Sequence, residues 1–98
     1  MTEKNFQVLR VELAKRGIPL LCVQYPMRNI NALKKIVHND PSIVFVDNEQ
    51  IFKDAVGRDG FSAYFTDAFA GDFGHCTKKG NRLLAEHVAD AIMRFMRQ

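Results

Sequence analysis

The chain has 98 residues and a formal net charge of +3, with 47% hydrophobic and 26% charged residues. This length predicts a single domain over residues 1–98, and the composition is that of a soluble globular protein. No apolar run approaches the ~20 residues of a membrane span, and no apolar segment follows the charged start MTEKN, so we expect a cytoplasmic protein that does not engage membranes. The basic residues are scattered without interleaved aromatic residues, so we expect no nucleic-acid partner.

The first expected element is a helix over residues 3–16. Its apolar residues at helical spacing are Phe6, Leu9, Leu13 and Ala14. Gly17 stands where a helix terminator is expected. The apolar run IPLLCVQYP, residues 18–26, then predicts a strand buried on both faces, with Cys22 packed as a small hydrophobic residue.

A second helix is expected from Asn29 or Asn31, either of which can cap it, to about residue 38. Its inward residues would be Ile30, Leu33, Ile36 and Val37. The stretch NDPS interrupts the chain, and IVFV, residues 43–46, predicts a second buried strand because it is rich in β-branched residues. Asp47 and Gln50 have the spacing of a capping box and predict a third helix, ended after Ala55 by VGRDG. A long loop then leads to the turn around Asp72.

The last expected helix begins near residue 78, with Thr77 as its N-cap. Its apolar stripe comprises Leu83, Leu84, His87, Val88, Ala91, Ile92, Phe95 and Met96. The alternation of helices and strands predicts an α/β fold with two parallel strands joined by a right-handed connection. Two parallel strands are fewer than a self-sufficient sheet normally contains, so we expect a partner to complete it.

The stretch GDFGHCTKKGNRLLAEHVADAI, residues 71–92, resembles the last block of the SGNH (GDSL-type) hydrolases, which are serine esterases with a flavodoxin-like α/β fold. Asp72, His75, Gly80 and Ala85 match that block in order. The runs IPLLCVQYP and IVFVDNEQIF resemble the last two strands of the family. The resemblance therefore implies a partial flavodoxin-like fold, with a short parallel sheet flanked by helices, equivalent to the C-terminal half of such a hydrolase.

The resemblance implies that His75 is the general base of a Ser-His-Asp triad and that Asp72 orients its ring. The Gly-Asp-Ser block that holds the nucleophile of the family is absent from the sequence, as are its Gly and Asn blocks. Ser42 precedes a strand, Ser62 lies in no strand-to-helix turn, and Cys76 follows His75 directly, so its side chain should point away from the ring. We therefore expect a truncated ester hydrolase segment that is inactive alone.

Two other readings remain open. The chain could be a non-catalytic, self-associating interaction module, or a small-ligand binder that uses the carboxyl ends of the strands. A metal site built from Asp67, Asp72, His75 and His87 matches no known ligand spacing, so we expect neither metal nor cofactor.

By the resemblance, the strand that would flank IPLLCV, residues 18–23, is absent, so we expect an exposed edge on that strand unless the loop over residues 56–71 covers it. The helix faces on residues 6–14 and 83–96 are expected to be bare and apolar. We therefore expect a homodimer or a Ser-bearing partner segment.

Overall fold

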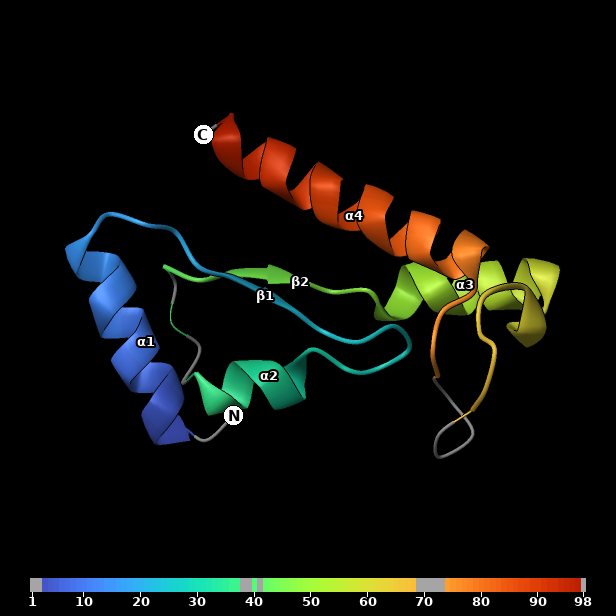
Figure 1. Ribbon diagram of the computed structural model, residues 1–98, viewed down its shortest axis with the longest axis horizontal. Helices are drawn as coiled ribbons and strands as arrows, with labels where there is room; N and C mark the ends of the chain where they lie inside the picture. The colour runs from blue at the N-terminus through green and yellow to red at the C-terminus, as the bar shows by residue number, and fades with distance from the viewer. Residues whose placement is uncertain (1–2, 38–39, 41, 69–73, 98) are drawn as a thin grey trace.

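A computed structural model describes residues 3–37, 40, 42–68 and 74–97 of the chain (Figure 1). The elements in chain order are α1 (Glu3–Lys15), β1 (Leu21–Val23), α2 (Asn31–Ile36), β2 (Val44–Val46), α3 (Glu49–Asp59), a 3₁₀ helix η1 (Phe61–Ala63) and α4 (Lys78–Met96). The predicted α/β class, with a short parallel sheet flanked by helices, is confirmed.

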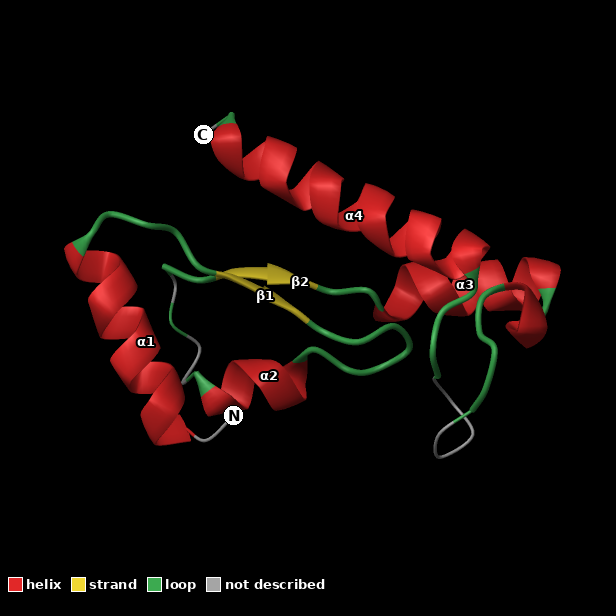
Figure 2. Cartoon of the chain, viewed as in Figure 1, coloured by secondary structure: helices red, strands yellow, loops and turns green. Residues whose placement is uncertain are grey.

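The sheet consists of β1 and β2, which run parallel. Their register pairs Leu21 with Val44, Cys22 with Phe45 and Val23 with Val46. Helix α4 lies on one side of the strands and α1 and α2 lie on the other (Figure 2). The two strands are therefore sandwiched between helices, as in larger parallel sheets.

Helix α1 ends at the predicted glycine. Gly17 has a φ of +66°, a conformation that favours glycine. The amide of Gly17 donates to the carbonyl of Ala14 at 3.2 Å, and that of Ile18 donates to Leu13 at 3.0 Å. These two bonds satisfy the last carbonyls of the helix in the pattern of a Schellman motif.

The start of α2 uses one of the two asparagines that were candidates for its cap. Asn29 accepts a 2.7 Å hydrogen bond from the amide of Asn31 through its side-chain oxygen. The N-cap position itself is occupied by Ile30, which makes no side-chain cap. Asn29 thus supplies the hydrogen bond from one position earlier than a standard cap.

The capping box predicted for α3 does not form, and the predicted C-terminal end was wrong. Asp47 accepts from the amide of Glu49 at 3.0 Å, but Gln50 bonds to Asp54 at 2.8 Å instead of returning to Asp47, so no capping box forms. The helix continues through Gly57, which weakens a helix by only about 1 kcal/mol, and stops at Gly60, whose φ is +91°.

The core is divided between two clusters. One lies around the sheet and contains Phe6, Cys22, Val37 and Ile43. The other joins α3 to the segment after it and contains Phe52, Ala55, Tyr64 and Phe65. Phe52 is fully buried, with its ring centroid 6.2 Å from that of Tyr64 in an edge-to-face arrangement. The second cluster supports the base of α4, because Leu83 and Leu84 pack against it.

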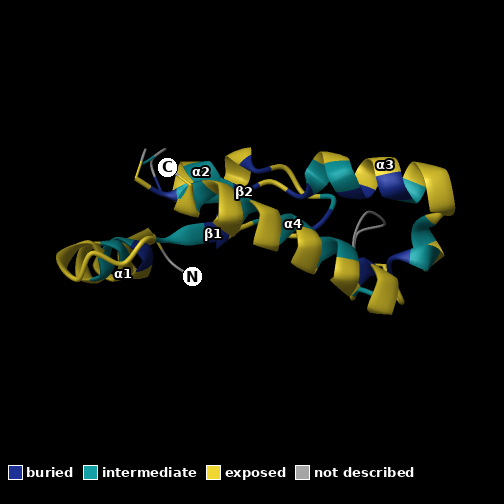
Figure 3. Cartoon of the chain, turned by 90° about the horizontal axis from the view of Figure 1, so that it is seen from above, coloured by how far each residue is buried: buried dark blue, intermediate teal, exposed yellow. Residues whose placement is uncertain are grey.

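Several side chains expected to face inward are exposed, namely Leu9, Ala14, Ile36, Ile92 and Met96. For Ile92 and Met96 on α4 the physical reason is length. Helix α4 has 19 residues and is about 28 Å long, whereas a strand of 3 residues spans about 10 Å. The sheet therefore cannot cover the full length of α4, and much of its surface is exposed (Figure 3).

Candidate functional site

The segment that leads into α4 is pinned to the segment that follows η1. Phe65 and Cys76 form an antiparallel bridge. The amide of Thr66 donates to the carbonyl of His75 at 2.8 Å, and the amide of Thr77 donates to that of Tyr64 at 2.9 Å. Residues 64–66 and 75–77 therefore lie side by side, which fixes the backbone on both sides of His75.

Thr77 anchors the first turn of α4, as predicted. Its hydroxyl accepts from the amide of Gly80 at 3.1 Å and donates to the carbonyl of Ala63 at 2.6 Å. One side chain thus caps the helix and ties it to η1.

The His75 imidazole is held by the carboxylate of Asp67. Nδ1 of the ring lies 2.6 Å from Oδ2 of Asp67, and the backbone amide of His75 donates to Oδ1 at 2.7 Å. The side chain of His75 is 73% exposed and that of Asp67 is 44% exposed. A single carboxylate therefore fixes both the backbone and the ring of His75 at an accessible position.

These hydrogen bonds lower the pKa of Asp67, with the bond to the His75 ring as the largest cause and the bond to its amide as the second. Asp67 is therefore ionised at neutral pH and acts only as an acceptor, so the proton in the 2.6 Å contact resides on Nδ1. In the neutral ring this tautomer puts the lone pair on Nε2, the nitrogen that serves as general base in a Ser-His-Asp triad.

Asp72, the predicted orienting residue, lies outside the described residues, so its pairing with His75 stays a prediction. Sequence reasoning missed Asp67 as a partner of the ring. Asp67 and His75 meet because Phe65 and Cys76 form a bridge between their segments, and no local sequence pattern predicts this bridge.

Two glycines allow these segments to approach closely. A Cβ on Gly74 would lie 1.9 Å from the carbonyl oxygen of Asp67, and a Cβ on Gly80 would lie 2.2 Å from that of Tyr64. Gly80 is one of the residues that carries the resemblance to the SGNH block. Its physical role here is to let the first turn of α4 pack directly against the backbone that precedes Asp67.

A polar cluster around Asp59 also holds the start of α4. The hydroxyl of Tyr64 donates to Asp59 at 2.5 Å, and Arg58 and Lys79 lie 3.3 and 3.4 Å from the same carboxylate. The bond from Tyr64 is the largest cause that lowers the pKa of Asp59. The cluster joins the end of α3 to the start of α4.

The candidate nucleophiles are placed unfavourably. Ser42 precedes β2 and its hydroxyl donates to Asp40 at 2.7 Å. Ser62 lies in η1, away from any strand-to-helix turn. Burial raises the pKa of the Cys76 thiol, so this group is protonated and weakly nucleophilic at neutral pH.

A second polar contact lies at the carboxyl ends of the strands. Asn48 is fully buried, donates to the carbonyl of Gln24 at 2.8 Å and contacts Nδ1 of His87 at 2.6 Å through Oδ1. His87, a member of the predicted apolar stripe of the last helix, is half-buried. Asn48 thus joins β1, β2 and α4, a structural role that the sequence did not suggest.

The small-ligand reading has a candidate pocket, and the metal reading is tested only in part because Asp72 lies outside the described residues. A pocket of about 300 Å³ at the carboxyl ends of the strands is lined by Gln24, Met27, Arg28, Asn29, Ala32, Glu49 and Lys53. Among the residues that the structure describes, no three His, Cys, Asp or Glu side chains are grouped so that they could hold a metal ion. Within the same residues, no helix combines the length and apolar character needed to cross a membrane.

Comparisons with known proteins returned no match: no family model, no curated protein and no solved structure is similar to this chain at a significant level.

Proposed function

We propose that this chain carries the histidine–carboxylate part of an ester hydrolase of the SGNH type, with a flavodoxin-like arrangement of its strands and helices. The observation that supports the proposal is the pair of hydrogen bonds that the Asp67 carboxylate makes with His75, at 2.6 Å to Nδ1 and at 2.7 Å to the backbone amide. His75 lies shortly before α4, in the block whose sequence resembles that family, and Asp67 precedes this block.

The chemistry that this arrangement suits is proton transfer to and from a serine hydroxyl. Nε2 of His75 accepts the hydroxyl proton as the serine attacks an ester carbonyl, and the imidazolium that results is stabilised by a carboxylate on Nδ1. Asp67 occupies that position, and by the resemblance Asp72 is the second candidate for it. The bridge to residues 64–66 and the cap of α4 keep the ring in place, as a catalytic base requires.

The serine and the oxyanion-hole donors of this hydrolase belong to a different segment. That segment carries a Gly-Asp-Ser block and either precedes Met1 in the natural reading frame or is a separate partner chain. It would extend the parallel sheet beyond β1, whose described pairing is with β2.

The test uses the protein expressed from its natural gene with all in-frame upstream coding sequence, assayed on p-nitrophenyl butyrate. His75→Ala should lower kcat by about 10³-fold or more with little change in KM. His87→Asn is the matched control, because the amide nitrogen of asparagine is placed like Nδ1 and can still donate to Asn48, while His75 is untouched. Activity that survives His75→Ala, or a protein whose serines fail to react with a fluorophosphonate reagent, would refute the proposal.

A self-associating interaction module is the second candidate function, and exposed apolar side chains favour it. Ile92, Met93 and Met96 on α4 are between 40% and 73% exposed. Such surfaces in a small protein mark sites of association. Under this proposal the chain forms a homodimer, and sedimentation equilibrium at micromolar concentration tests it: a stable monomer would rule it out.

A further inference from the structure

The chain exposes more surface than a compact protein of its size. Its accessible surface is 6724 Å². A compact monomer of 11.2 kDa exposes about 5,700 Å², so the excess is about 1,000 Å². The radius of gyration is 14.9 Å, against about 12.6 Å for a compact chain of this length. A standard protein–protein interface buries about 800 Å² on each partner, so the excess is the size of one side of such an interface.

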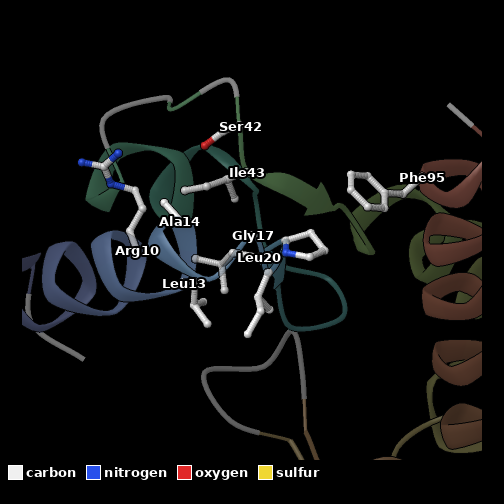
Figure 4. Close-up of a pocket in the computed structure, with 10 residues that line it drawn as sticks. Arg10, Leu13, Ala14, Gly17, Leu20, Ser42, Ile43 and Phe95 are labelled. Carbon is white, nitrogen blue, oxygen red and sulfur yellow. The ribbon is translucent and has the colours of Figure 1, made fainter.

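Part of this excess surrounds an open pocket between α1 and α4. The pocket has a volume of about 400 Å³. Side chains of α1 (Leu13 and Ala14) and of α4 (Phe95) line it, together with Leu20 before β1 and Ile43 before β2 (Figure 4). We call it the α1–α4 pocket. Its lining is predominantly apolar, and Arg10 lies at its margin, where it forms an ion pair with Asp40 at 2.8 Å.

The same end of α4 presents an apolar stripe that its own chain does not cover. The stripe consists of Ile92, Met93 and Met96, which are 40%, 52% and 73% exposed. Met96 is four positions from Ile92 and three from Met93, so the three side chains share one broad helix face. Phe95 points into the α1–α4 pocket, whereas the stripe faces another direction. The chain therefore carries an exposed apolar stripe beside the apolar α1–α4 pocket.

We infer that a second copy of this chain docks here, with the α4 stripe of each copy inserted into the α1–α4 pocket of the other. Such a contact is self-complementary, which a twofold dimer requires, and twofold dimers are the commonest closed assemblies. Methionine side chains are flexible enough to fill an irregular hollow. The interface rests on the self-association proposed above and is independent of the hydrolase proposal.

The experiment measures the mass of the full chain by sedimentation equilibrium between about 1 and 100 µM, a range that brackets ordinary dimer affinities. The wild type should have twice the monomer mass of 11.2 kDa. Met96→Lys should weaken the dimer by about tenfold or more, because it places a charge at the centre of the contact. Since Met96 is 73% exposed, this variant should keep the circular dichroism of the folded chain.

Two further variants separate this interface from the alternatives. Val8→Lys is the matched control, because Val8 is 59% exposed on a helix but does not line the pocket, and it should leave the dimer intact. Val23→Pro removes an amide that points away from β2, since Gln24 donates to Val46 and strand residues alternate in direction. It should also leave the dimer intact.

A wild-type chain that stays monomeric would overturn both self-association and this interface. A dimer that withstands Met96→Lys would overturn the interface alone. If that dimer is instead disrupted by Val23→Pro, the copies pair through the outer edge of β1.

Discussion

The close approach of α4 to the backbone at Tyr64 can be tested with two glycine substitutions that should act in opposite directions. Gly80→Ala adds a Cβ 2.2 Å from the carbonyl oxygen of Tyr64. That oxygen cannot easily move, because it accepts the 2.9 Å bond from Thr77 and Tyr64 is 2% exposed. Gly57→Ala adds a Cβ that meets nothing within 4 Å.

The expected magnitudes follow from these surroundings. Overpacking a rigid site costs about 1–3 kcal/mol, so Gly80→Ala should lower the free energy of unfolding by about 2 kcal/mol. This corresponds to a fall in Tm of about 8–16 °C for a domain of this size. Gly57→Ala should instead raise the free energy of unfolding by up to about 1 kcal/mol, because alanine is the better helix former and Gly57 lies inside α3.

Urea and thermal unfolding followed by circular dichroism measure both effects. The Gly57→Ala variant controls for the general gain of replacing a helical glycine. If Gly80→Ala stabilises the chain as Gly57→Ala does, then α4 does not pack directly on the backbone at Tyr64, and the described support of His75 is wrong.

Three further predictions concern the site and its core. The contact with His75 lowers the pKa of Asp67 below its ordinary value of about 3.9. The contribution of this contact to the free energy of unfolding is therefore fully present above about pH 3.9. It is lost as the pH falls through the lower pKa that Asp67 has in the folded chain. The difference in urea midpoint between wild type and Asp67→Asn should therefore shrink below about pH 4, and a difference that stays constant would contradict the contact. Phe52→Ala should cost about 3–5 kcal/mol of unfolding free energy, because Phe52 is fully buried between aromatic rings, and a loss below about 1 kcal/mol would mean that the cluster is not packed. The 98-residue chain should hydrolyse p-nitrophenyl acetate no faster than its His75→Ala variant, since no activated nucleophile accompanies the ring; turnover that Cys76→Ala abolishes would identify a thiol nucleophile instead.

The order of the elements could be predicted because each has a local signal. The β-branched run at residues 43–46 predicted β2, and Gly17 and Thr77 marked helix ends that the structure confirms. Gly57 misled the prediction of where α3 ends, because a glycine inside a helix costs little while neighbouring turns continue to form hydrogen bonds. Local signals therefore predict which elements form better than where they stop.

The candidate site depended on contacts between distant residues, which local patterns do not reveal. The spacing of Asp72 and His75 directed attention to a nearby carboxylate, whereas Asp67 reaches the ring across a bridge between segments. The fully buried Asn48 reads as an ordinary polar residue between a strand and a helix. Its role comes from Gln24 and His87, which belong to other elements.

The two ends of helix α4 have different roles, so substitutions at the two ends should have additive effects. Its first turn is capped by Thr77 and packed on Tyr64, so it holds His75, whereas its last turns carry the exposed Met96. Gly80 and Met96 are 16 positions apart on one helix, which is about 24 Å, and side chains this far apart with no shared partner act independently. In a chain that carries both Gly80→Ala and Met96→Lys, the loss of monomer stability should equal that of Gly80→Ala alone, and the loss of dimer affinity should equal that of Met96→Lys alone. Unfolding measured at a concentration where the chain is monomeric, together with sedimentation, separates the two quantities. A coupling above about 0.5 kcal/mol would mean that association at the end of α4 alters the site at its beginning.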